Sequence, residues 1–249
     1  MLIQKWRVII QDRQKAQSFV ELAIVLPVLL LILLGLVEIA FFIARYLDVM
    51  DLTREAARAA SLRDPQVQQA YTYTNGAYQC NRTLPYSFYY TSACVFAPPE
   101  GSAACSADPK FCGGLNPLIY VDHTVDDVLI EVFTVKGHTV VDKVNPPAGY
   151  WALSDHDSDL SHNDNWKKDC KGNLLSPTPQ PYYTAAKVES ELISTSPMNK
   201  GFVGVEFYYC YHQVLAIPFA NLFVSDPARV HAYTIMPLPM AVPTPTPEP

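Results

Sequence analysis

The residues best suited to chemistry lie in a stretch rich in aspartate and histidine, SDHDSDLSHNDNW, at positions 154–166. Three aspartates fall at positions 1, 3 and 5 of an EF-hand calcium loop, and two histidines add potential transition-metal ligands. However, Leu160 stands where such a loop needs glycine, and Trp166 stands where it needs a bidentate glutamate. We therefore interpret the stretch as a solvated polar loop and expect no metal or other cofactor. The residues concerned are Asp155, His156, Asp157, Asp159 and His162.

Other patterns of catalytic and nucleic-acid-binding sites are missing from the sequence. There is no G-x-S-x-G motif, and Gly113-Gly114 follows a cysteine rather than joining a strand to a helix. The net charge of −6 provides no basic surface for nucleic acid. We expect a protein that is not an enzyme and does not bind nucleic acid.

Six cysteines are the next reactive groups, and none of them forms a C-x-x-C pair that would indicate zinc or redox chemistry. All six follow the apolar segment described below, on the side that we expect to lie outside the cytoplasm. An even number of cysteines there is typical of disulfides, although buried free thiols are the alternative. Fifteen complete pairings are possible, and the sequence does not choose among them. The candidates are Cys80, Cys94, Cys105, Cys112, Cys170 and Cys210.

Two carboxylates interrupt an otherwise apolar segment that runs from Phe19 to Ala44. As a helix this segment would rise about 39 Å, which is enough to cross a hydrocarbon core of about 30 Å with some tilt. It is longer than the apolar region of a cleaved signal peptide. Glu38 is explained as an acid near the boundary of a tilted span. Glu21 lies just inside the start of the span and calls for a partner, because an ionisable group within a spanning segment is costly.

Two explanations for Glu21 remain open. Its carboxylate can reach the membrane interface, or it can pair with an α-amino group that is created by cleavage between Ala16 and Gln17. In the second case, the ammonium group of a neighbouring subunit would set the stagger of packed helices. Pro27 predicts a kink in the span, and Gly35 offers a point of close helix approach.

The charges that flank the span predict its orientation. Four basic residues, Lys5, Arg7, Arg13 and Lys15, precede it and are opposed only by Asp12. Such a basic leader favours an N-terminus inside the cell. We expect a single-pass protein of the cytoplasmic (inner) membrane, with its C-terminal domain outside the cytoplasm.

The elements that follow the span predict an α+β fold. The helix continues through residues 44–62 with an apolar stripe that includes Leu47 and Met50, and it ends at Asp64-Pro65. Residues 65–115 read as a loop-rich segment stapled by disulfides, and strands follow at 126–144, 201–214 and 229–238. The first of these regions predicts a hairpin with its turn at Lys136-Gly137. The expected domains are a leader (1–16), the long helix (17–64), an extracytoplasmic domain (65–240) and a disordered Pro/Thr tail (241–249).

Residues 16–61 also carry a family pattern: Val20-Glu21-Leu22-Ala23, then Leu26-Pro27, then TREAARAA at 53–60. In these parts the chain resembles the TadE/TadG-like family of the tight-adherence (Flp) pilus assembly system, although Ala16 replaces the usual glycine. The resemblance implies a pseudopilin-like membrane component that contacts the lipid bilayer, other pilus-assembly subunits and a prepilin peptidase. The alternatives are a membrane-tethered adhesion module and a tethered metal-dependent enzyme.

Overall fold

The computed structural model describes residues 2–63, 65, 80, 88–107, 109, 111–142, 149–156, 163–192, 198–215 and 225–238, and the side chains from residue 19 onward. The chain divides into two compact units. The first contains residues 1–44 and 212–226, and the second contains residues 45–211 and 227–249. Each unit is described by itself below.

The N-terminal element is a single long helix, α1 (Leu2–Ser61). Among the described residues it is the one helix long and apolar enough to span a membrane. Its leucine, isoleucine and valine side chains between Phe19 and Ile43 are largely exposed, as expected of a surface that lipid would cover. The helix continues through Pro27, and it begins at Leu2, ahead of the predicted start at residue 17.

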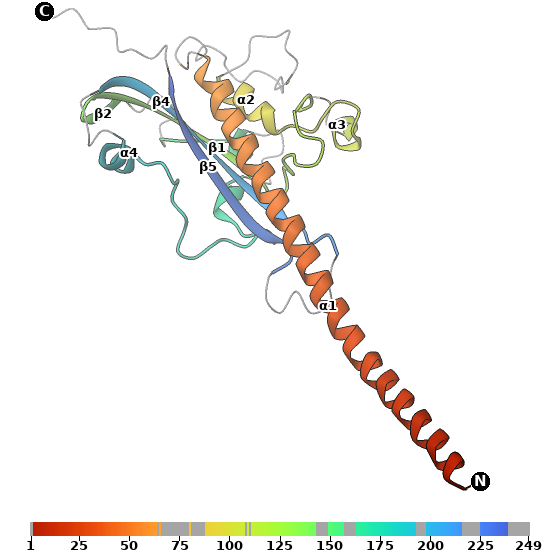
Figure 1. Cartoon of the computed structure of the whole chain (residues 1–249). Coiled ribbons are helices and arrows are strands. Elements are labelled where there is room, and N and C mark those ends of the chain that lie inside the picture. The colour runs from red at the N-terminus through yellow and green to blue at the C-terminus, as the bar shows by residue number, and fades with distance from the viewer. Residues whose placement is uncertain are drawn as a thin grey trace, which may run out of the picture. The chain divides into compact units, whose positions relative to one another are not determined.

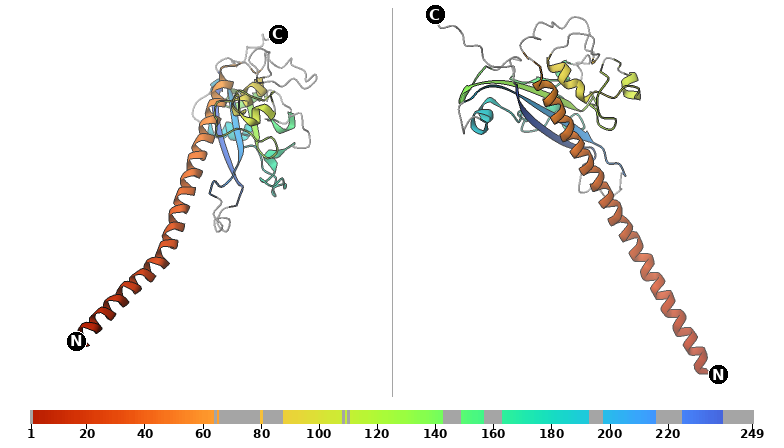
Figure 2. Two further views of the ribbon diagram at one scale, coloured as in Figure 1. Left: turned by 90° about the vertical axis from the view of Figure 1, so that its right-hand side faces the viewer. Right: turned by 45° about the horizontal axis from the view of Figure 1, so that its top comes forward.

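The last turns of α1 belong to the second unit and bury one narrow face. The buried positions recur at intervals of three and four residues, which place them on one side of a helix. Leu47, which we assigned to this stripe, is instead 54% exposed. This part of α1 lies next to the sheet in all three views (Figures 1 and 2). The buried residues are Val49, Leu52, Thr53, Ala56, Ala57 and Ala60.

The second unit is built on a five-stranded antiparallel sheet in the order β2-β1-β4-β5, with the short β3 also paired to β1. Its central strands β1 and β4 pair along their whole common length, from Asp127↔Tyr208 to Gly137↔Met198. The turn between β1 and β2 at Gly137 confirms the predicted hairpin, since glycine there adopts a φ of 67°. The strands are β1 (Asp127–Gly137), β2 (Thr139–Asp142), β3 (Trp151–Ala152), β4 (Met198–Tyr211) and β5 (Ala228–Leu238).

Short helices surround this sheet and are labelled in Figure 1 where there is room. On one face the ring of Phe96 lies 4.6 Å from that of Phe207. On the other face Trp166 packs with Leu129 and Tyr208. Both faces of β4 are therefore covered. The short helices are α2 (Phe88–Ala93), η1 (Cys94–Phe96), α3 (Ala103–Ala107), η2 (Ser154–His156), η4 (Asn165–Lys167) and α4 (Ala185–Glu191).

All six cysteines form disulfides, which confirms the expectation from the sequence and selects one pairing. The bonds join Cys80 to Cys94, Cys105 to Cys112, and Cys170 to Cys210. The last of them ties the loop after η4 to the end of β4. Together with the long apolar helix and the antiparallel sheet, they confirm the α+β, disulfide-stapled class.

Candidate functional site

The residues singled out in the span all lie on α1. Ala16 and Gln17 are within the helix, and the backbone is helical on both sides of the bond between them. Glu21 and Gly35 are fourteen residues apart, so at about 100° per residue they lie within about 40° of each other around the helix. A Cβ added to Gly35 would meet no atom within 4 Å, and the helix surface there is open.

Glu38 has a structural role that the sequence did not suggest. Its carboxylate accepts hydrogen bonds from two successive backbone N–H groups, Val214 at 2.9 Å and Leu215 at 2.8 Å. These residues follow β4 and lie 176 and 177 positions away along the chain. Glu38 is only 9% exposed, whereas most of the span around it is exposed.

A second carboxylate, at the end of the same connection between β4 and β5, binds residues at its start. Asp226 accepts the N–H of Gln213 at 3.2 Å, and its carboxylate lies 3.7 Å from Nδ1 of His212. Three consecutive N–H groups at positions 213–215 are therefore bound by two acidic side chains. Only the sequence position of Glu38, near the end of an apolar run, could have signalled this arrangement.

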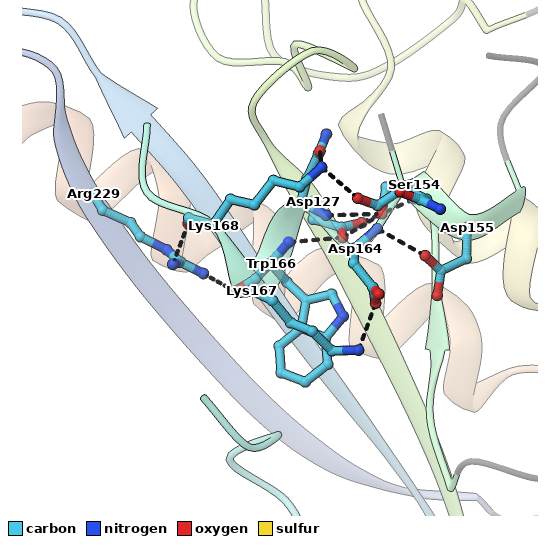
Figure 3. A network of polar contacts seen from close by, with 10 residues as sticks. Asp127, Ser154, Asp155, Asp164, Trp166, Lys167, Lys168 and Arg229 are labelled. Carbon is cyan, nitrogen blue, oxygen red and sulfur yellow. Dashed lines mark hydrogen bonds and ion pairs between the residues drawn. The ribbon is translucent and has the colours of Figure 1, made fainter. Parts of the chain in front are cut away.

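The two ends of the Asp/His stretch are held by the side chain of Asp127. Asp127, at the start of β1, accepts the N–H of Ser154 at 3.0 Å, the hydroxyl of Ser154 at 2.7 Å and the N–H of Trp166 at 3.1 Å (Figure 3). It thus binds both ends of the stretch. Burial raises the pKa of Asp127 to about 6, although these hydrogen bonds favour the charged form.

The described residues inside the stretch also bind other residues of the protein. Asp155 accepts the N–H of Asp164 at 2.9 Å, and Lys167 forms an ion pair with Asp164 at 2.7 Å (Figure 3). The ring of His156 stacks on Trp151 at 5.0 Å. Within the described residues, no group of three or more acidic, histidine or cysteine side chains is placed to hold a metal ion. Asp157, Asp159 and His162 lie outside the described residues.

Arg229 of β5 holds the far end of this loop. Its guanidinium donates to the carbonyl oxygens of Trp166 and Lys168 (Figure 3). The guanidinium also lies 4.6 Å over the ring of Tyr208. The interaction of the positive charge with the ring face adds to the two hydrogen bonds. The loop is therefore attached to β1 through Asp127, to β5 through Arg229 and to β4 through the Cys170–Cys210 disulfide.

A second buried acid, Glu206 of β4, lies on the same face of the sheet as Trp166 and Tyr208. Its carboxylate accepts the N–H groups of Tyr182 and Tyr183, the hydroxyl of Tyr208 at 2.8 Å and Nε2–H of His231 at 2.8 Å. Burial alone would raise the pKa of Glu206, but the hydrogen bonds and the adjacent His231 lower it below its ordinary value.

Glu131 of β1 lies beside Glu206 and is also fully buried. Burial and the neighbouring charge of Glu206 raise the pKa of Glu131 well above its ordinary value. Its side chain occupies the space above Gly204, where an added Cβ would lie 2.7 Å from a Glu131 carboxyl oxygen and 2.9 Å from the ring of Tyr183. Pairs of acids with separated pKa values suit acid–base chemistry, but both side chains have 0% exposure. We therefore assign the pair a structural role.

Comparison with known proteins gives one result that bears on the span. Residues 16–58 match the family of TadE-like proteins. No curated protein and no solved structure matches the chain. The matched segment covers the apolar part of α1, including Glu21, Gly35 and Glu38, and most of its buried end. Residues 16–58 are thus similar to TadE-like proteins, as the motifs at Glu21, Pro27 and 53–60 predicted.

Proposed function

We propose that this chain is a membrane-anchored, pseudopilin-like component of a tight-adherence pilus assembly system or a related secretion machine. The supporting observation is that the TadE-like match and the membrane-spanning candidate coincide on α1. The role is assembly rather than catalysis. The N-terminus lies in the cytoplasm, and the disulfide-stapled domain lies outside the cytoplasmic membrane, where disulfides persist.

The span acts by packing against the helices of other pilus-assembly subunits. Glu21 and Gly35 lie on similar sides of α1, and the surface at Gly35 is open. A small residue lets a neighbouring helix approach closely, while an acid in a low-dielectric setting favours one stagger of the helices over others. Glu21 and Gly35 therefore define the packing side of the span.

Processing by a prepilin peptidase would place a positive charge near Glu21. Cleavage between Ala16 and Gln17 makes Glu21 the fifth residue of the mature chain and leaves a new α-amino group near the membrane face. Intact mass or N-terminal sequencing of membrane-extracted protein tests this step. A start at Gln17 supports cleavage, and a start at Met1 contradicts it. A start near Ala60 would contradict the anchor as well.

A helix replacement separates this proposal from the adhesion-module alternative. Residues 17–44 are exchanged for an unrelated spanning helix, and the membrane fraction is checked for the intact protein. The pseudopilin-like role requires that pilus assembly or secretion then fails, because the packing side is lost. Retained function with the foreign helix would show that α1 serves only as a tether.

A further inference from the structure

We infer that the chain enters the membrane a second time, at Val214 and Leu215, and that Glu38 holds this part of the β4–β5 connection against the lipid. The partner is the acyl region of the bilayer next to the domain-side boundary of the span. The inference rests on the membrane anchoring in the proposed function, but it does not depend on a role in pilus assembly.

The depth of the Glu38 contact in the membrane follows from the position of Glu38 on α1. Glu38 lies six residues before Ala44, where the apolar run ends. At 1.5 Å per residue this is about 9 Å inside the end of the run. The N–H groups of Val214 and Leu215 bind the Glu38 carboxylate directly, so their backbone lies at the same level of the helix.

The side chains at this level are apolar and uncovered within the chain. Val214 is 51% exposed and Leu215 is 37% exposed. On α1, the neighbouring side chains Leu34, Val37 and Phe41 are also exposed. Exposed apolar side chains from two separate segments thus lie at about the same level of a candidate span, which fits lipid rather than water.

The hydrogen bonds to Glu38 and Asp226 supply the acceptors that the N–H groups of non-helical backbone need within the hydrocarbon layer. A backbone N–H that leaves water for hydrocarbon without an acceptor is strongly unfavourable. Here Glu38 accepts two such groups, and Asp226 accepts the N–H of Gln213 just before them. The same bonds remove Glu38 from lipid contact, which explains why an acid in the span is buried.

Site-specific photocrosslinking of the full-length chain tests the inference. The photoreactive residue p-benzoylphenylalanine is placed at Leu215, and the protein is reconstituted in vesicles of phosphatidylethanolamine and phosphatidylglycerol. After irradiation, intact mass distinguishes a phospholipid adduct from a crosslink to a second copy. We expect phospholipid adducts at Leu215 and at Val214, in yields similar to that at Ile39 in the span.

Leu174, which is 73% exposed in the sheet domain, is the control position and should give no lipid adduct. Adducts at Ile39 without adducts at positions 214 and 215 would overturn the inference, as would crosslinks at those two positions only to another copy of the chain. Failure of the Ile39 position itself would instead overturn the membrane anchoring, and with it the proposed function.

The part played by Glu38 has its own test. In the chain that carries the probe at Leu215, Glu38→Gln should lower the lipid adduct several-fold, because one of the two carboxylate acceptors becomes an amide donor. The yield at Ile39 should not change. Glu55→Gln alters an exposed glutamate of the same helix and serves as the matched control. An unchanged adduct at Leu215 in Glu38→Gln would contradict the holding role of Glu38.

Discussion

At the scale of single residues, Glu131 and Glu206 show how surroundings separate two identical side chains. Both are fully buried on adjacent strands. Glu206 receives hydrogen bonds from four donors and remains charged, while the pKa of Glu131 is raised by burial and by that charge. Such a pair is stable only if one member keeps its proton.

Replacing each acid by its amide should therefore have unequal effects. Glu131→Gln substitutes one neutral polar group for another, so we expect a loss in the free energy of unfolding below about 1 kcal/mol at pH 7. Glu206→Gln turns an NH2 group toward donors and should cost about 3 kcal/mol. Denaturant unfolding of the detergent-solubilised chain measures both. Equal losses would contradict the assignment of the proton to Glu131.

Three buried acids with raised pKa values, Asp126, Asp127 and Glu131, predict how stability depends on pH. The folded chain raises the pKa of Asp126 to about 8, that of Asp127 to about 6 and that of Glu131 well above its usual value, in each case chiefly by burial. A raised carboxyl pKa contributes stability below the unfolded pKa, near 4, that is lost as pH rises through the folded value. We expect the free energy of unfolding to fall between about pH 4 and pH 8.

In unfolding measurements at several pH values, Glu131→Gln should show a shallower decline than the natural chain. Glu206 acts in the opposite sense, because its pKa is lowered, and its contribution is lost only as pH falls below about 4. An increase in stability from pH 5 to pH 8 would contradict the raised pKa values of the buried acids.

Gly204 makes the Glu131–Glu206 arrangement possible, and the sequence alone marks it only as a glycine within a strand. An alanine there would place its Cβ 2.7 Å from Glu131 and 2.9 Å from Tyr183. We expect Gly204→Ala to lower the free energy of unfolding by about 2 kcal/mol, because the core must move. Gly35→Ala, where nothing lies within 4 Å, is the control and should cause no loss.

At the scale of elements, the sequence predicted those helices and strands that are determined by a local pattern of apolar and polar residues. The apolar span was predicted from the length of the apolar run, and the continuation of α1, the β1–β2 hairpin and the long strand β4 were predicted from residue spacing and turn residues. The disulfide pairing was not, because it depends on how distant segments meet. Glu38 was missed for the same reason, since its partners lie at positions 214 and 215. Alternation along a strand places Glu206 on the same face as Tyr208, but it does not reveal that this face is covered.

The open surface of α1 at Gly35 gives a prediction about helix packing. Gly35→Leu should leave folding and membrane insertion unchanged, because a Cβ at this position would meet no atom within 4 Å. It should nevertheless weaken association with partner spans, since close approach needs a small residue. A reporter of transmembrane helix association measures the effect. Leu33→Phe enlarges the opposite side of α1 and should have little effect; equal loss in both variants would refute a specific packing side.

The three disulfides should contribute unequally to stability. Cys170 and Cys210 are 40 positions apart and fasten the loop after η4, whereas Cys105 and Cys112 are only 7 apart. In the chain-entropy account, a longer closed loop loses more freedom when it is crosslinked. Replacing Cys170 and Cys210 by serine should therefore cost about 1 kcal/mol more than replacing the other pair. Thermal unfolding of the two double variants makes the comparison.

At the scale of the whole molecule, composition and flanking charge predicted a tethered extracytoplasmic protein, and the structure adds an apolar helix and three disulfides to that expectation. In spheroplasts, externally added protease should remove a tag placed after Pro249 and leave a cytoplasmic marker protein intact. Protection of the tag would reverse the proposed orientation. Fractionation of the same cells should recover the chain with the cytoplasmic membrane.

The contact between Glu38 and the β4–β5 connection also sets an order of events during synthesis. Val214 is added 176 residues after Glu38. At about 5–20 residues per second, roughly 9–35 s therefore pass between the synthesis of Glu38 and the synthesis of the peptide groups that bind its carboxylate. Until then the helix carries an acid without its final partners, and a chain truncated before β4 would never acquire them. The anchor is therefore completed only when the connection after β4 has been synthesised.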